Sequence, residues 1–124
     1  MTRQISEIAK KESDIQYHIT SLKPIRPENK ADDWEKKALL EIKLNWEQRM
    51  IHKCESITYE FAFPDYRVRD LTNSVEGVND TLVSAGVLKD DNWKVTGTIT
   101  LMGHKAGNED DIGVLITFNG VEYE

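Results

Sequence analysis

Apolar and polar residues alternate along four stretches of the chain, and this period of two predicts four strands with one buried face each. The apolar positions are Ile15, Tyr17 and Ile19; Ile57, Tyr59, Phe61 and Phe63; Trp93, Val95, Ile99 and Leu101; and Ile112, Val114, Ile116 and Phe118. Gly97 interrupts the third stretch and is predicted to form a bulge. The segment from Gly103 to Asp111 is predicted to be a loop.

Two other stretches have the period of a helix. From Ala31 to about Ile51, large apolar residues recur at every fourth position, which predicts a long amphipathic helix that packs across a sheet. A second helix is predicted where three apolar residues share one face before a glycine, namely Val75, Val78, Leu82 and Gly86. Residues 1–13 are weakly helical in pattern.

The order of these elements is strand, helix, strand, helix, strand, strand. It predicts an α+β fold, with a mixed four-stranded sheet and two main helices on it. The chain has 124 residues, which suits one domain over residues 1–124, with residues 1–13 as an N-terminal extension.

Composition narrows the class of protein. The chain has 16 Lys and Arg against 22 Asp and Glu, a net charge of −6, which argues against a generic nucleic-acid coat. No apolar run reaches the roughly 18 residues of a membrane span, and the N-terminus lacks the pattern of a signal peptide, so we expect a cytoplasmic protein. Cys54 is the single cysteine and is predicted to be a buried apolar residue.

Candidate chemistry lies around the second predicted helix. Asp70 precedes this helix, and Asp90 and Asp91 follow it. A helix of this length spans roughly 22 Å, so these carboxylates meet at one Mg²⁺ only if the chain folds back beside the helix. Spacing alone favours the alternative, in which Asp70 caps the helix and the Asp90–Asp91 pair forms a turn.

The same region resembles the signature of RusA-type Holliday-junction resolvases. That pattern is R-D-x-D-N, then D-x-L, a Gly and D-D, and it is matched by Arg69-Asp70-Leu71-Thr72-Asn73, Asp80-Thr81-Leu82, Gly86 and Asp90-Asp91. The matched region covers about residues 61–95. Several spaced matches are more specific than any one of them.

The resemblance implies a homodimeric, Mg²⁺-dependent endodeoxyribonuclease that resolves four-way junctions in phage or prophage recombination and repair, with Mn²⁺ as a substitute metal. It implies that Asp70, Asp90 and Asp91 act in catalysis and that Asp70 and Asp91 hold the metal. Basic residues near this site would hold DNA phosphates: Arg67, Arg69, Lys89 and Lys94. Asn73 and Asp80 would support the motif.

Two positions depart from the family pattern. Thr72 replaces a family aspartate, and Glu76 replaces a family lysine. Glu76 would be a compensating metal ligand, would repel DNA or, as the spacing favours, would form a capping box with Asn73. Two other hypotheses remain beside the nuclease. Thr72 and Glu76 favour a dimer that binds branched DNA without cleaving it, and the acidic net charge favours a module that binds a protein partner.

Overall fold

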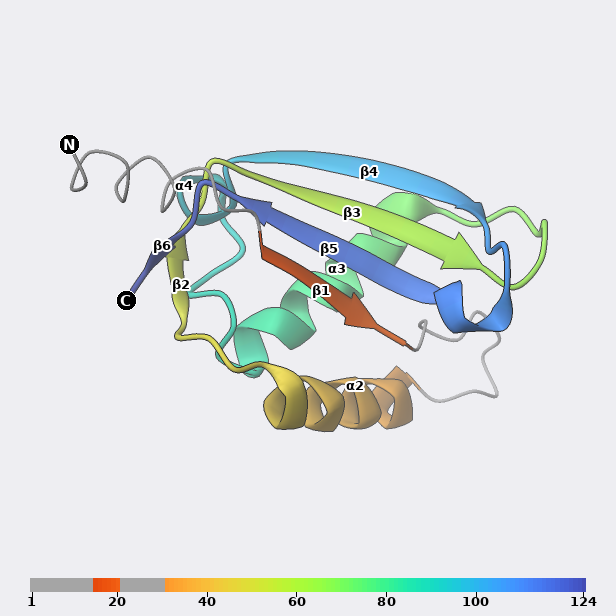
Figure 1. The fold of residues 1–124 in the computed structure, drawn as a ribbon, viewed down its shortest axis with the longest axis horizontal. Helices are drawn as coiled ribbons and strands as arrows, with labels where there is room; N and C mark the ends of the chain where they lie inside the picture. The colour runs from red at the N-terminus through yellow and green to blue at the C-terminus, as the bar shows by residue number, and fades with distance from the viewer. Residues whose placement is uncertain (1–14, 21–30) are drawn as a thin grey trace, which may run out of the picture.

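The computed structural model describes residues 15–20 and 31–124, and its central element is a mixed four-stranded sheet (Figure 1). The strand order is β1-β5-β3-β4, formed by β1 (Ile15–Ile19), β5 (Gly113–Asn119), β3 (Ser56–Phe63) and β4 (Thr98–Lys105). The pair β3–β4 is parallel, while β5 is antiparallel to both β1 and β3. The predicted α+β class with a mixed four-stranded sheet is confirmed.

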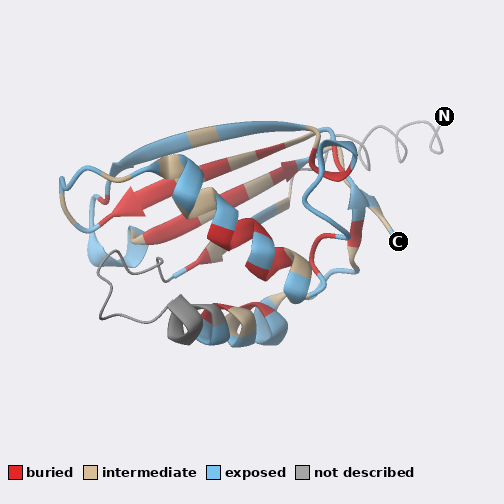
Figure 2. Cartoon of the chain, turned by 180° about the vertical axis from the view of Figure 1, so that it is seen from behind, coloured by how far each residue is buried: buried red, intermediate tan, exposed pale blue. Residues whose placement is uncertain are grey.

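Helices cover one face of this sheet, which is seen from behind in Figure 2. The helix α3 (Leu71–Ser84) connects β3 to its parallel neighbour β4, as a parallel pair requires a crossover connection. The helix α2 (Ala31–Asn45) lies beside α3, near β1. The smaller elements are β2 (Ile51–Lys53), α4 (Trp93–Thr96), the 3₁₀ helix η1 (Glu109–Asp111) and β6 (Glu122–Tyr123), with β2 and β6 paired in a second small sheet.

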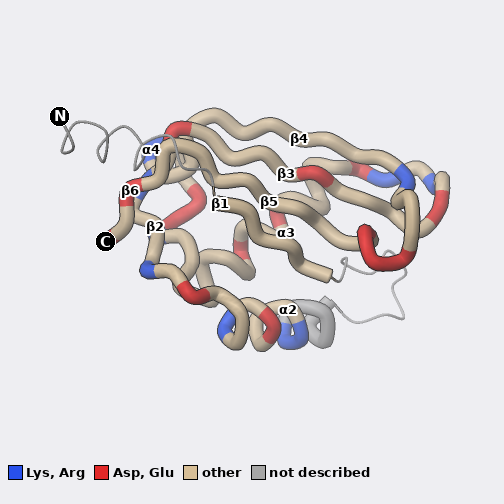
Figure 3. The backbone as a smooth tube through the Cα atoms, in the orientation of Figure 1, with Lys and Arg blue, Asp and Glu red and all other residues tan. Residues whose placement is uncertain are grey.

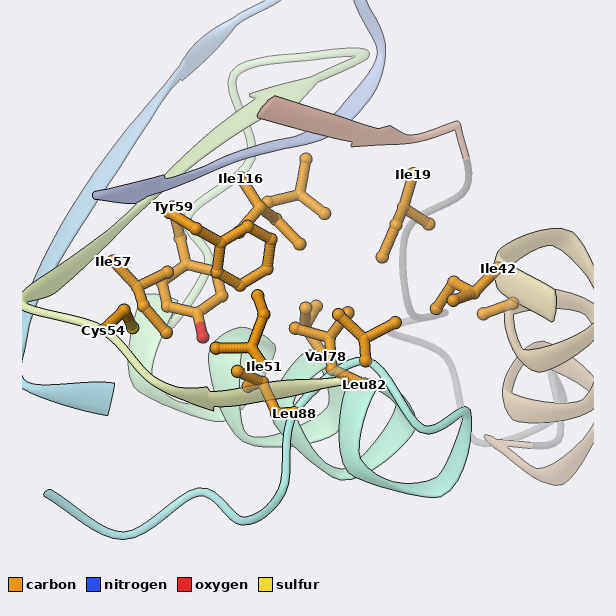
Figure 4. Packing of buried hydrophobic residues seen from close by; sticks show 14 of the residues in the cluster. Ile19, Ile42, Ile51, Cys54, Ile57, Tyr59, Val78, Leu82, Leu88 and Ile116 are labelled. Atoms are coloured by element: carbon orange, nitrogen blue, oxygen red, sulfur yellow. The ribbon is translucent and has the colours of Figure 1, made fainter. Parts of the chain in front are cut away.

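The core lies between the sheet and the two long helices (Figure 4). The predicted alternation places the apolar side chains of β3 and β5 toward α3, where Tyr59, Phe61 and Phe118 are the largest buried side chains. Ile42 of α2 and Leu82 of α3 are fully buried against them. The single cysteine, Cys54, is also buried as predicted, and burial raises the pKa of its thiol to about 11.

Several sequence predictions of local structure are wrong. The first helix ends at Asn45 and does not continue to Ile51, because Ile51 begins β2 and its backbone N–H donates to Val87. Part of the predicted loop, from Gly103 to Lys105, belongs to β4. The prediction of a helix in residues 1–13 lies outside the described residues.

The predicted start of the third strand and the predicted bulge at Gly97 are also wrong. Residues Trp93–Thr96 form α4, because the Asn92 side chain accepts a hydrogen bond from the Lys94 backbone and caps a helical turn. Gly97 is the C-cap of α4 and not a bulge, with φ of 65°. A Cβ atom there would lie 2.1 Å from the Glu55 carbonyl oxygen, so only glycine fits this close approach.

Candidate functional site

The N-terminus of α3 is capped by Asp70. Its carboxylate accepts hydrogen bonds at 3.0 Å from the Thr72 backbone N–H and at 2.6 Å from the Thr72 hydroxyl. These bonds hold the pKa of Asp70 below its usual range, with the hydroxyl bond as the largest cause. Asp70 is therefore an ionised, exposed helix cap, and Thr72 is part of that cap.

The other candidate aspartates lie beyond the opposite end of α3. Asp90 accepts hydrogen bonds from the Asp91 backbone N–H at 2.7 Å and from the Asn92 side chain at 2.9 Å. These two bonds lower the pKa of Asp90. This geometry is that of a turn, as the alternative based on spacing predicts.

The described residues do not fit a metal site shared by these carboxylates. Fourteen residues of α3 separate the Asp70 cap from the segment that leads to Asp91, a span of about 21 Å along the helix. Among residues 15–20 and 31–124, no three His, Cys, Asp or Glu side chains gather in a group that could hold a metal ion. The metal role of Asp70, Asp91 and Glu76 stays a prediction from the sequence.

The capping-box prediction for Asn73 and Glu76 is wrong. The N-cap is Asp70, three residues earlier, so Asn73 lies within the helix. Asn73, Glu76 and Asp80 are exposed on α3.

The four candidate basic residues separate into two groups. Lys89 lies at the end of the molecule opposite to the Asp70 cap, where its Nζ is 3.5 Å from Glu124 Oε1. Lys94 belongs to α4, and its Nζ lies 5.7 Å from the centroid of the exposed Trp93 ring. Arg67 and Arg69 precede α3, in the loop that follows β3.

This loop is held in place by an ion pair inside it. The Arg69 guanidinium donates to Asp65 Oδ1 at 2.7 Å and lies 4.6 Å from the centroid of the Phe63 ring. Its side chain is only 10% exposed. The Arg69 hydrogen bond is the main cause that lowers the pKa of Asp65, whose carboxylate also accepts from the Arg67 backbone N–H. The ion pair thus fixes the loop from within.

The fixed loop exposes an aromatic ring among cations. Tyr66 is 86% exposed and Val68 is fully exposed. Lys105, at the end of β4, places its Nζ 5.7 Å from the centroid of the Tyr66 ring, while the side chain of Arg67 is 61% exposed. We call residues 64–70 with 104–106 the tip; charged residues of both signs gather at this end of the sheet in Figure 3.

His104 adds a titratable group to the tip. Its Nδ1 lies 3.0 Å from the Lys105 carbonyl oxygen, and its Nε2 lies 2.9 Å from Glu60 Oε2. Both ring nitrogens thus face acceptors, which favours the doubly protonated imidazolium. The pKa of His104 is raised by the backbone bond first and by Glu60 second.

The sequence pattern singled out Arg67 and Arg69 as candidates, but not Tyr66 and Lys105, which lie at the same tip. The reason is the parallel register of β3 and β4, which pairs Phe63 with Lys105 and thereby brings the ends of the two strands together. A pattern within one strand carries no information on that register.

No helix among residues 31–124 has the length and apolar character that a membrane span requires.

Comparison with known proteins corrects the family expected from the motif. The family model described as Tll0287-like matches residues 1–79, and no match to a RusA family is found, so the RusA resemblance is wrong. No curated protein matches the chain significantly. The physical reason for the false resemblance is that its motif residues have local roles, since Asp70 caps α3, Asp90 forms a turn and Gly86, with φ of 80°, follows the end of α3. The match covers more than half of the sequence, and the chain therefore belongs to the Tll0287-like family.

Proposed function

We propose that the protein binds nucleic acid through the tip, and that its target is DNA with unpaired bases, such as a single strand or a branch point. The observation that carries the proposal is the exposed Tyr66 ring with Lys105 beside it and Arg67 next to it in the chain. Proteins that bind unpaired bases combine such a ring, on which a base stacks, with cations that hold the backbone phosphates.

Cations lie close to the Tyr66 ring although the net charge of the chain is −6 and acidic residues such as Asp111 lie at the same end. Asp65 pairs with Arg69, while Asp70 keeps its negative charge as the helix cap that accepts from the Thr72 hydroxyl. Lys105 lies beside the ring, and Arg67 shares Asp65 with Arg69, at 3.8 Å from Asp65 Oδ2, while 61% of its side chain stays exposed. Phosphates respond to the local field, so an acidic total does not prevent a contact at this end.

A protein partner is the second candidate. Tyr66 and Arg67 favour a protein partner because tyrosine and arginine are enriched at the centre of protein interfaces. The fully exposed Val68 next to Arg67 adds apolar surface to the same patch. Salt separates the two candidates, because only a phosphate contact loses affinity steeply between about 50 and 200 mM salt.

The test is fluorescence anisotropy with labelled single-stranded, duplex and four-way-junction DNA. We expect Tyr66→Ala to weaken binding of the single strand by about 5- to 150-fold, the equivalent of about 1–3 kcal/mol of stacking. Tyr66→Phe keeps the ring and should bind like the wild type. Lys105→Ala should reduce the slope of log affinity against log salt by about 1.

The matched control is Lys43→Ala, which removes an exposed lysine from α2 and leaves the tip unchanged. A loss of binding in Lys43→Ala equal to that in Lys105→Ala would mean that only total charge matters and would overturn the proposal. Mg²⁺ in one arm tests the cleavage that the sequence predicts: DNA products that disappear in Asp70→Asn would identify a nuclease.

A further inference from the structure

Within residues 15–20 and 31–124, the strand β4 is paired along one edge only. It pairs with β3 along its whole length, and no other described strand pairs with its second edge. Seven of its eight residues are exposed, and Leu101 is half-buried. A strand of this length with unpaired N–H and C=O groups is a template for pairing with another strand.

This edge lacks the features that usually prevent such pairing. The sequence of β4 has no proline, its register with β3 runs without a bulge, and its only Lys, Arg, Asp or Glu is Lys105 at the last position. Two large apolar side chains remain exposed along it, with Ile99 at 39% and Met102 at 43%. Native edge strands are commonly protected by charges, bulges or prolines, so the bare edge indicates a partner.

We propose that β4 pairs antiparallel with β4 of a second copy of the chain, around a two-fold axis at Leu101. A two-fold axis perpendicular to the sheet keeps the helices of both copies on the same side. Each residue can then face only a residue whose side chain lies on the same face. Ile99, Leu101 and Gly103 share the helix side, and Thr98, Thr100, Met102 and His104 share the open side.

Centring the pair on Leu101 gives a self-complementary set of contacts. On the helix side, Leu101 faces Leu101 of the second copy, and Ile99 faces Gly103, which has no side chain to obstruct it. On the open side, Thr100 faces Met102. Opposite apolar pairs stabilise antiparallel strands, and no charge faces a like charge in this register.

The pairing joins two four-stranded sheets into one and has a consequence for the tip. In this register, Gly97 of one copy lies opposite Lys105 of the other. Gly97 follows α4 directly, so α4 of each copy comes next to the tip of the other. The inference rests on β4 alone and is independent of nucleic-acid binding.

The proposal is tested by placing like or opposite charges at Thr100 and Met102, the two positions of the open side that face each other across the axis. Met102→Lys is common to both variants, because Met102 lies opposite Glu60 of β3 and a lysine at its position would be tolerated in the single chain. The variant T100K/M102K places lysines opposite each other across the axis, whereas T100E/M102K places glutamate opposite lysine. The mass of each protein is measured by sedimentation equilibrium across a range of concentrations, with thermal melting as the control for folding.

We expect the wild type to shift from 14.3 kDa toward twice that mass in the micromolar range, because one strand-to-strand contact is smaller than a standard interface of about 1,600 Å². T100K/M102K should weaken association at least about tenfold, and T100E/M102K should restore it in a salt-sensitive manner. A wild type that stays monomeric, or two folded variants that associate equally, would overturn the proposal.

Discussion

His104 is a residue whose environment can be tested directly. Its ring nitrogens face the Lys105 carbonyl oxygen and Glu60 Oε2, and these two acceptors raise its pKa above the ordinary value of 6.5. A raised pKa in the folded state means that protonation stabilises the fold. That contribution is fully present below about pH 6.5 and is lost as pH rises through the raised pKa.

We therefore predict an NMR titration midpoint for His104 above 6.5, and a lower midpoint in Glu60→Gln, where one acceptor loses its charge. A His104 midpoint at or below 6.5 would contradict the hydrogen bonds described here. The effect on stability is small because the side chain is 45% exposed.

Asp70 shows why residue type alone does not define a metal site. An aspartate before a helix suits both a cap and a ligand, and only the hydrogen bonds distinguish the two. Thr72 donates two of them to Asp70, so the position that departs from the motif has a structural role in this chain.

At the scale of elements, α3 depends on this cap. Asp70→Ala should lower the free energy of unfolding by about 0.5–2 kcal/mol, and Asp70→Asn should lower it less, because asparagine is also a good N-cap. Urea denaturation measures both. Because the pKa of Asp70 is lowered, its contribution is present above the ordinary value of 3.8 and lost as pH falls below it.

The matched control for the cap is Asp80→Ala, which removes an exposed aspartate from the body of the same helix. If it destabilises the protein as much as Asp70→Ala does, loss of charge explains the effect and the cap does not. An Asp70→Asn protein as unstable as Asp70→Ala would likewise contradict capping.

Alternation along the chain was sufficient to predict β1, β3 and β5 because each has one buried and one open face. It failed at Trp93–Thr96, where the pattern of a strand hides a capped helical turn. It also missed β2 and β6, which are too short to show a period and are defined by contacts distant in sequence. Local patterns thus predict long elements well, and they predict poorly the short elements that depend on contacts distant in sequence.

At the scale of the whole molecule, the fold separates two regions that the sequence places around one helix. The crossover α3 carries the chain from the tip to the opposite end, where Asp91 and Lys89 lie. A single acidic site would require the chain to return beside α3 and bring Asp91 back to Asp70. The carboxylates instead stay near opposite ends of the helix. The parallel register of β3 and β4 instead assembles the tip, from segments about forty residues apart.

The proposed contact between the tip and nucleic acid is tested by recording ¹⁵N–¹H correlation spectra of the labelled protein while unlabelled single-stranded DNA is added. We predict that the amide signals of residues 65–70 and 104–106 shift in a saturable manner and that added salt reverses the change. Signals that move only at the opposite end, around Lys89 and Lys94, or that do not move at all, would contradict the proposal.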